Sequence, residues 1–206
     1  MTVRITREGG ICRIVLDRPD KANSLTEAML RQIRDAVRAA EPDSVLILTG
    51  AGRVFSGGAD LEAARAGLAT SPLWEEVSAA VAGFPGLSLA LLNGSAAGGA
   101  LGMVLACDLR VAVPGTRIFY PVMRLGHLPQ PSDPARLRAL VGPARTKLIL
   151  MAGAKLDAAE ALAMGLVDRV TADPEAEVET LARDVLAAPE GHAAAVKRLC
   201  DGGRAI

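Results

Sequence analysis

Residues 46–61, LILTGAGRVFSGGADL, combine the end of a short apolar run with a loop that contains four glycines. The run, residues 44–49, reads SVLILT, and such a stretch is typical of a strand that is buried on both faces. Downstream, Leu87–Leu92 leads in the same way into a second glycine-rich stretch, NGSAAGG, at residues 93–99. The nearly apolar residues 100–107 that follow predict a helix buried on every side. We therefore expect a site where these two strands end.

The composition of the two loops argues against three common kinds of site. Gly50 and Gly52 begin a dinucleotide-binding pattern, but Phe55 stands where its third glycine belongs. Neither loop ends in the Gly-Lys-Ser/Thr sequence of a phosphate-binding loop. Ser56 and Ser95 lack the glycine two residues earlier that a serine-hydrolase nucleophile turn requires.

Both loops supply backbone N–H groups beside residues with small side chains. Gly98 and Gly99 also lead directly into the predicted buried helix, whose positive N-terminal end attracts negative charge. One N–H donor from each loop would form an oxyanion hole, which is the chemistry that the two loops together indicate. Glycines at strand ends also serve turns and close packing, and this structural interpretation stays open for each loop by itself.

Length and composition limit the remaining possibilities. The 206 residues are 50% hydrophobic but only 2% aromatic, so we expect one domain with an aliphatic core. The 23 basic residues balance the 23 acidic ones, which argues against a nucleic-acid partner. No apolar run approaches the ~20 residues of a membrane helix, and the start MTVRITREGG lacks a signal-peptide region. These features predict a soluble, cytoplasmic protein that does not enter a membrane.

The cysteines and histidines are few and scattered. Cys12, Cys107 and Cys200 are too widely spaced for a disulfide framework or a zinc site, and we expect buried free thiols. His127 and His192 are the only histidines, which excludes a His-rich metal site. We therefore predict no metal centre, although a metal held mainly by carboxylates stays open.

The rest of the chain alternates strands and helices. A hairpin is predicted for residues 3–7 and Ile11–Leu16. A helix over residues 26–40, capped by Ser24 or Thr26, ends before Pro42. Other segments follow from caps, glycine stops and apolar spacing: helices near 72–82, 143–152, 157–164, 174–188 and 190–200, and strands at 109–113 and 166–170.

Five passages resemble the crotonase superfamily, the enoyl-CoA hydratase/isomerase family. Two of them are specific, residues 14–25 (IVLDRPDKANSL) and 46–61. Residues 93–99 with 107–110 (CDLR) and residues 158–170 also resemble family motifs, and residues 121–129 match more loosely. The resemblance implies an α/β fold, a spiral of β-β-α units that form two roughly perpendicular sheets surrounded by helices. It also implies a CoA thioester as substrate or ligand, no tightly bound cofactor, and assembly as a homotrimer or homohexamer.

The resemblance treats residues 1–206 as a single crotonase-like domain. Its core covers about residues 1–171, followed by a short helical segment, about 172–206, without the family's usual final helices. Those helices normally help to cover the acyl pocket and to support trimer contacts, so we expect a more open pocket or a partner subunit in their place.

The resemblance also assigns site residues. It implies that the backbone N–H groups of Ala59 and Gly99 hold the thioester oxygen. The residues that it places along the CoA moiety or at the oxyanion loops are Lys21, Ala22, Ser56, Gly57, Asp60, Leu61 and Gly98. Asp60 is also expected to orient its own loop through hydrogen bonds.

The departures from the family pattern concern proton transfer. Hydratases of the family flank the substrate with two glutamates, and the matching positions here are Gly102 and Val122, which cannot transfer protons. Replacement groups are sought in residues 126–133. His127 is a candidate base or a loop histidine, Gln130 can only orient a partner, and Asp133 is a candidate acid–base group or a helix cap.

Tyr120, the only tyrosine, either faces the pocket or packs in the core. Together these observations favour a decarboxylase of a malonyl-type thioester or a double-bond isomerase over a hydratase, because departure of CO₂ itself creates the enolate. The alternative is a non-catalytic member that binds acyl-CoA or assists a partner enzyme.

Overall fold

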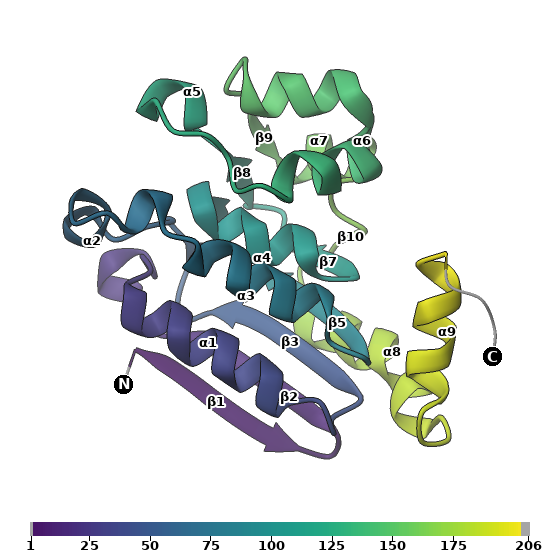
Figure 1. The fold of residues 1–206 in the computed structure, drawn as a ribbon. Coiled ribbons are helices and arrows are strands. Elements are labelled where there is room, and N and C mark those ends of the chain that lie inside the picture. The colour runs from purple at the N-terminus through teal and green to yellow at the C-terminus, as the bar shows by residue number, and fades with distance from the viewer. Residues whose placement is uncertain (1, 203–206) are drawn as a thin grey trace.

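The computed structural model describes residues 2–202 and contains two β-sheets with helices around them (Figure 1). The large sheet has the strand order β1-β2-β3-β5-β7-β10, and the small sheet has the order β4-β6-β8-β9. The strands of the large sheet are β1 (Val3–Glu8), β2 (Ile11–Leu16), β3 (Val45–Gly50), β5 (Leu87–Leu92), β7 (Leu109–Ala112) and β10 (Arg169–Val170). Those of the small sheet are β4 (Val54–Ser56), β6 (Ser95–Ala97), β8 (Arg117–Phe119) and β9 (Lys155–Asp157). This arrangement confirms the expected α/β fold class.

The chain adds to the two sheets alternately. β3 of the large sheet continues into β4 of the small one, β5 continues into β6, and β7 into β8. Helices α2 (Leu61–Arg65) and α3 (Leu73–Ala82) follow β4, and α4 (Leu101–Ala106) follows β6. Because β4 and β6 pair in parallel, the two loops that follow them emerge at the same edge of the small sheet.

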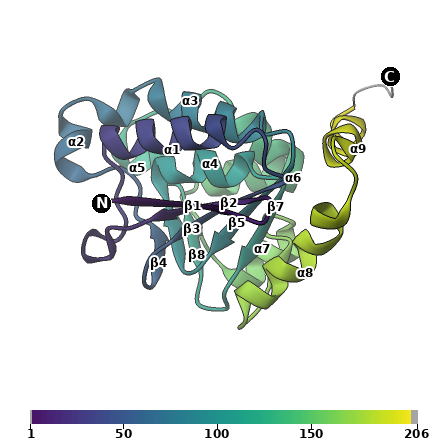
Figure 2. The ribbon, with the colours of Figure 1, turned by 90° about the horizontal axis from the view of Figure 1, so that it is seen from below.

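Helices cover both faces of the large sheet. Figure 2 views this sheet along its plane, with α1 (Glu27–Ala39), α3 and α4 on one side and α8 (Pro174–Ala187) on the other. Leu46 and Leu48 of β3 join the core beneath α1, whereas Val45 and Ile47 pack with Val178 of α8. The strand is therefore buried on both faces, as its uninterrupted apolar sequence predicted.

Several local predictions are confirmed by the observed elements. The N-terminal hairpin pairs from Val3 opposite Leu16 to Glu8 opposite Ile11. Thr26 caps α1, because its hydroxyl oxygen accepts a hydrogen bond from the Met29 amide. α9 (His192–Cys200) and α7 (Ala158–Met164) also match predicted segments, and α7 begins with a capping box between Asp157 and Glu160.

Other boundaries differ for physical reasons. The strand predicted for 166–170 is reduced to β10, because the Leu166 and Val167 amides both bond back to Ala161 O at the end of α7. The helix predicted for 143–152 belongs to a longer element, α6 (Asp133–Leu150), which is broken at Gly142 with φ 80°. α5 (Val122–Leu125) and the four short strands of the small sheet lie in segments that we predicted as loops or left unassigned.

The cysteine prediction is correct for two of the three thiols. Cys12 and Cys107 are buried, and this burial raises the pKa of their thiols to about 11 and about 12. Cys200 is exposed, so the expectation that it would be buried is wrong. It lies at the end of α9, a helix with no fully buried residue.

Residues 2–202 contain no helix long and apolar enough to cross a bilayer. They also contain no group of three or more His, Cys, Asp or Glu residues placed to hold a metal ion. Residues 203–206 of the C-terminal segment lie outside the described residues.

Replacing Gly94 with alanine is expected to loosen the small sheet. A Cβ at Gly94 would overlap the carbonyl group of Arg53, where the segments entering β4 and β6 meet. We expect a loss of about 1–3 kcal/mol in the free energy of unfolding, which thermal denaturation would detect as a lower Tm. Gly115→Ala is the control, since a Cβ there has nothing within 4 Å. Equal melting of the two variants would contradict the expectation.

Candidate active site

The two glycine-rich loops touch each other. A Cβ at Gly58 would lie 2.9 Å from Ala97 O, and a Cβ at Gly98 would lie 3.7 Å from Gly58 Cα. Both glycines have positive φ, 95° and 58°, a conformation that favours glycine. The close approach of the loops therefore depends on the absence of side chains at these two positions.

The backbone amides of Ala59 and Gly99 are available as donors. Within residues 2–202, neither of these two amides donates a hydrogen bond. Their surroundings are nevertheless fixed, because Leu25 N donates to Gly58 O at 2.8 Å and Asp60 N donates to Leu25 O at 2.9 Å. An anionic or polarised oxygen is the natural partner for such unpaired donors.

Ala59 and Gly99 both line one cavity of about 340 Å³. Its lining comes from the loop before α2 and from α2, from the start of α4, and from α5 with the segment after it. The surrounding residues are mostly small or apolar, and the titratable ones are Tyr120, Arg124 and His127. No Asp or Glu of the described chain lines this cavity. The cavity thus combines two backbone donors with an apolar wall and no carboxylate.

Trp74 forms the wall beside Gly99. A Cβ at Gly99 would lie 3.1 Å from the indole ring, so only glycine lets the ring pack this closely. The indole Nε1 donates a hydrogen bond to Leu68 O at 2.7 Å, which holds the ring in place. Trp74 is the only tryptophan of the sequence, so its fluorescence reports on this cavity alone.

Asn23 holds the first loop in shape. It is fully buried with φ 50°, and its side-chain nitrogen donates to Ala51 O at 2.9 Å and to Val54 O at 2.7 Å. Its side-chain oxygen accepts from the Arg18 amide at 2.8 Å. The role of Asn23 was not predicted from the sequence. The signal that could have indicated it is an asparagine inside a loop, since this residue type tolerates the left-handed conformation.

Ser56 and Asp60 serve the loop itself. The buried Ser56 hydroxyl donates to Asn23 O and accepts from the Gly58 amide. Asp60 caps α2 by accepting from the Glu62 and Ala63 amides, and it pairs with Arg18 at 3.2 Å. The Ala63 hydrogen bond, aided by Arg18, lowers the pKa of Asp60. Neither Ser56 nor Asp60 borders the cavity.

The other residues expected along CoA fall into two groups. Gly57, Leu61 and Gly98 line the cavity. Lys21 and Ala22 are exposed and do not line the cavity; they lie at the end of a single 3-10 turn (Pro19–Lys21). Ala22 is nevertheless linked to the first loop, because its carbonyl oxygen accepts a hydrogen bond from the Gly57 amide.

The acid–base candidates are also divided. His127, exposed between α5 and α6, lines the cavity, as do Gln130 and Val122. Asp133 does not line it: its side chain is fully buried and accepts a hydrogen bond from the Tyr120 hydroxyl at 2.8 Å. Asp133 is also not the cap of α6, because its carboxylate bonds Tyr120 instead of the amides of the first turn. Tyr120 both packs in the core and lines the cavity, so the two interpretations of this residue are compatible.

Gly102 faces Asp133 across the interface between α4 and α6. A Cβ at Gly102 would lie 3.3 Å from Asp133 Oδ1 and 3.7 Å from Ser78 Cβ. The Asp133 carboxylate therefore lies against the position from which a side chain at residue 102 would extend.

The sequence of this chain matches those of known proteins. A family model for enoyl-CoA hydratase/isomerase matches residues 6–201. The chain belongs to the enoyl-CoA hydratase/isomerase family. It is 32% identical over 181 residues to a probable enoyl-CoA hydratase, echA6, of Mycobacterium leprae, covering 85% of this chain and 73% of that relative. It is also 32% identical over 201 residues to the 4-chlorobenzoyl coenzyme A dehalogenase-2 of an Arthrobacter species, covering 91% and 73%.

Solved structures agree with this membership. An enoyl-CoA hydratase subunit I from Geobacillus kaustophilus superposes with a TM-score of 0.88 at 30% identity, covering 98% of this chain and 82% of that one. The resemblance of the five sequence passages to the crotonase superfamily is thereby confirmed. Membership of the enoyl-CoA hydratase/isomerase family gives the general class of this chain, which is an acyl-CoA enzyme of the crotonase type.

Proposed function

We propose that this protein binds an acyl-CoA thioester and stabilises its enolate with the backbone amides of Ala59 and Gly99. One observation supports the proposal: Ala59 and Gly99, whose amides have no hydrogen-bond partner among residues 2–202, come from separate loops and line the same cavity. Donors of this kind are already oriented before the negative charge develops, so they lower the energy of the transition state more than that of the substrate. CoA is then part of the substrate, and no tightly bound cofactor is needed.

The reaction that suits this cavity is decarboxylation of a malonyl-type thioester. Its lining includes no carboxylate among the described residues, and the family resemblance assigns Gly102 and Val122 to the positions of two glutamates. Decarboxylation needs no base to create the enolate, because the electron pair of the breaking C–C bond supplies it. Double-bond isomerisation is the second possibility and would need a displaced base such as His127.

The same lack of carboxylates supports a different candidate, a non-catalytic protein that binds acyl-CoA or assists a partner enzyme. The cavity and its amides would then select a ligand without converting it. Binding and turnover therefore have to be measured separately.

The test is to incubate the purified protein with crotonyl-CoA, a 3-enoyl-CoA and methylmalonyl-CoA and to identify products by mass spectrometry. Trp74 fluorescence, titrated with each thioester, measures binding without turnover. Loss of CO₂ from methylmalonyl-CoA supports the decarboxylase, and a shifted double bond supports the isomerase. Hydration of crotonyl-CoA would contradict the proposed chemistry, whereas binding without any product would support the non-catalytic candidate.

Introducing a glutamate at position 102 is expected not to create a hydratase. The new side chain would start 3.3 Å from Asp133 Oδ1 and bring a second carboxylate into a buried region. Gly102→Glu should therefore lower Tm and give no hydration of crotonyl-CoA. Gly102→Ala is the matched control, since it adds only the Cβ. Hydratase activity in the glutamate variant would show that the proton-transfer machinery needs only this one side chain.

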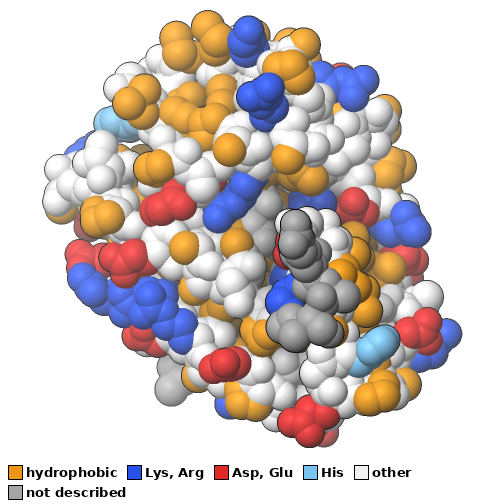
Figure 3. All heavy atoms as spheres, turned by 45° about the vertical axis from the view of Figure 1, so that its right-hand side comes forward, with side chains coloured by type: hydrophobic (Ala, Val, Ile, Leu, Met, Phe, Trp, Pro, Cys, Tyr) orange, Lys and Arg blue, Asp and Glu red, His pale blue; other side chains and the backbone are white. Residues whose placement is uncertain are grey.

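We also propose that the protein assembles as a homotrimer or homohexamer in the cytoplasm. Apolar side chains gather on the upper part of the molecule in Figure 3, over the region of α6. Met123, Leu148 and Met151 are 63%, 42% and 62% exposed, a degree of exposure that favours burial against another subunit. Light scattering after size-exclusion chromatography tests this assembly, and a monomer at micromolar concentration would contradict it.

A further inference from the structure

Tyr120 and Asp133 form a buried pair that connects the cavity with the interior of the protein. Tyr120 borders the cavity and is 3% exposed, whereas the side chain of Asp133, behind it, is fully buried. The Tyr120 hydroxyl donates to Asp133 Oδ2 at 2.8 Å and accepts from the Gln130 amide at 3.4 Å. A polar pair of this kind is costly to bury, and Tyr120 is the member of the pair that lines the cavity.

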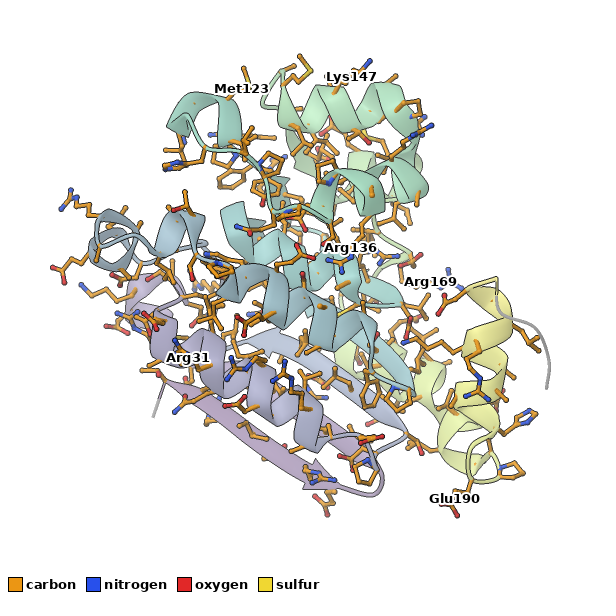
Figure 4. The ribbon with its side chains drawn as sticks, in the orientation of Figure 1. Arg31, Met123, Arg136, Lys147, Arg169 and Glu190 are labelled. Carbon is orange, nitrogen blue, oxygen red and sulfur yellow. The ribbon has the colours of Figure 1, made fainter. Side chains whose placement is uncertain are left out.

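Asp133 has an incomplete set of partners. Its Oδ1 atom is buried without a hydrogen bond, and the nearest cation, Arg136 Nη1, lies 3.9 Å away and is also unpartnered among the described residues. Arg136 extends from α6 between that helix and the α3–α4 layer (Figure 4). Gly102 of α4 also lies beside Oδ1, because a Cβ at Gly102 would be 3.3 Å from that atom. Burial favours the protonated form of this carboxyl group, whereas the Tyr120 hydroxyl and Arg136 favour the carboxylate.

We propose that Tyr120 donates the proton that quenches the enolate and that Asp133 supplies the replacement proton to Tyr120. This inference rests on the proposed function of the cavity. When CO₂ leaves, the C–C electron pair forms the enolate, whose oxygen is held by the two amides. The enolate carbon then takes the hydroxyl proton of Tyr120 as the new C–H bond forms. The Tyr120 oxygen takes the carboxyl proton of Asp133, and Asp133 regains a proton from solvent before the next turnover.

The electrostatics of the pair favour this direction of transfer. Burial, together with the nearby charge of Asp133, raises the pKa of Tyr120. A tyrosinate beside a carboxylate is therefore disfavoured, and Tyr120 and Asp133 do not both lose their protons at the same time. Burial also raises the pKa of Asp133 to about 6, which leaves part of the population protonated near neutral pH. The charged groups that act on Asp133 are Arg136 of its own helix, which lowers its pKa, and Glu75 of α3, which raises it. A protonated Asp133 reverses the hydrogen bond and frees the Tyr120 proton for the substrate.

The test compares the pH dependence of turnover in four proteins. In the wild type, kcat for methylmalonyl-CoA should be highest below pH 6 and fall with a slope of one as Asp133 ionises. Asp133→Asn and Tyr120→Phe should lower kcat about 10²-fold or more and remove this dependence. Thr146→Ala is the control: it breaks the bond from Thr146 Oγ1 to Gly142 O at 2.9 Å in the second half of α6 and leaves Glu75 and the Tyr120–Asp133 pair untouched, so it should keep the wild-type profile.

A second measurement does not require turnover. Because the pKa of Asp133 is raised from 3.8 to about 6, its contribution to stability is complete below about pH 4 and is lost as pH rises through 6. The difference in Tm between the wild type and Asp133→Asn should therefore change across this interval. No change across it, or an unaltered kcat profile in the two variants of the pair, would overturn the proposed proton path. A wild type that converts none of the thioesters would instead remove the proposed function, and the proton path with it.

Discussion

Replacing Gly99 with proline is expected to reduce turnover of an acyl-CoA substrate by about 10²–10³-fold. Proline removes the backbone N–H that we propose binds the thioester oxygen. Gly99 lies in the first turn of a 3-10 helix (Gly98–Ala100), a position in a helix where proline is tolerated, so the variant should stay folded. Product formation by mass spectrometry and Tm from circular dichroism measure the two effects separately.

The control for this variant is Gly99→Ala. Alanine keeps the N–H but places a Cβ 3.1 Å from the Trp74 ring, so it tests the steric effect alone. We expect alanine to retain far more activity than proline. Equal losses in the two variants would show that the contact with Trp74, not the hydrogen-bond donor, limits turnover.

Replacing Asn23 with alanine is expected to have the largest effect on stability. It removes the hydrogen bonds to Arg18 N, Ala51 O and Val54 O, each worth about 1 kcal/mol, and it places alanine at φ 50°. The expected loss is about 3–5 kcal/mol, or on the order of 10 °C in Tm for a chain of this size. Because Asn23 shapes the loop that contains Ala59, weaker quenching of Trp74 fluorescence by acyl-CoA should accompany the lower Tm.

Asn93→Ala is the matched comparison. Asn93 also links loops, since it accepts from the Gly50 amide at 3.1 Å and donates to Gly52 O at 2.9 Å, but it is only partly buried and has no positive φ. We expect a smaller loss, about 1–2 kcal/mol. If the two variants melt at the same temperature, the buried left-handed position of Asn23 has no special weight.

The features that sequence predicted are those set by neighbouring residues. The buried strand β3 follows from one uninterrupted apolar run, and the cap of α1 follows from Thr26 at the start of an amphipathic segment. The two glycine-rich loops were identified because each comes directly after such a strand. Local physics, namely periodicity and capping, is sufficient for these elements.

The features that sequence missed depend on residues that meet only in the folded chain. The strands β4 and β6 are three residues long, too short for any periodicity, and they exist because each pairs with the other. The Tyr120–Asp133 hydrogen bond joins the end of β8 to the start of α6, and the wall formed by Trp74 against Gly99 joins α3 to the start of α4. No spacing along the chain reveals such contacts.

The pairing of β4 with β6 has a consequence for how this family changes its chemistry. Adjacent strands in a sheet lie about 4.8 Å apart, and the loops with Ala59 and Gly99 each extend directly from one of these two strands. The separation of the two amides that we propose as donors therefore depends mainly on this strand pairing, while Asn23 helps to shape the loop that contains Ala59. A substitution at position 102 or 122 leaves this strand pairing unchanged, so the spacing of the proposed donors should be kept. If the amides act as proposed, the side chains that move protons can be exchanged on this scaffold while the backbone groups that hold the charge keep their places.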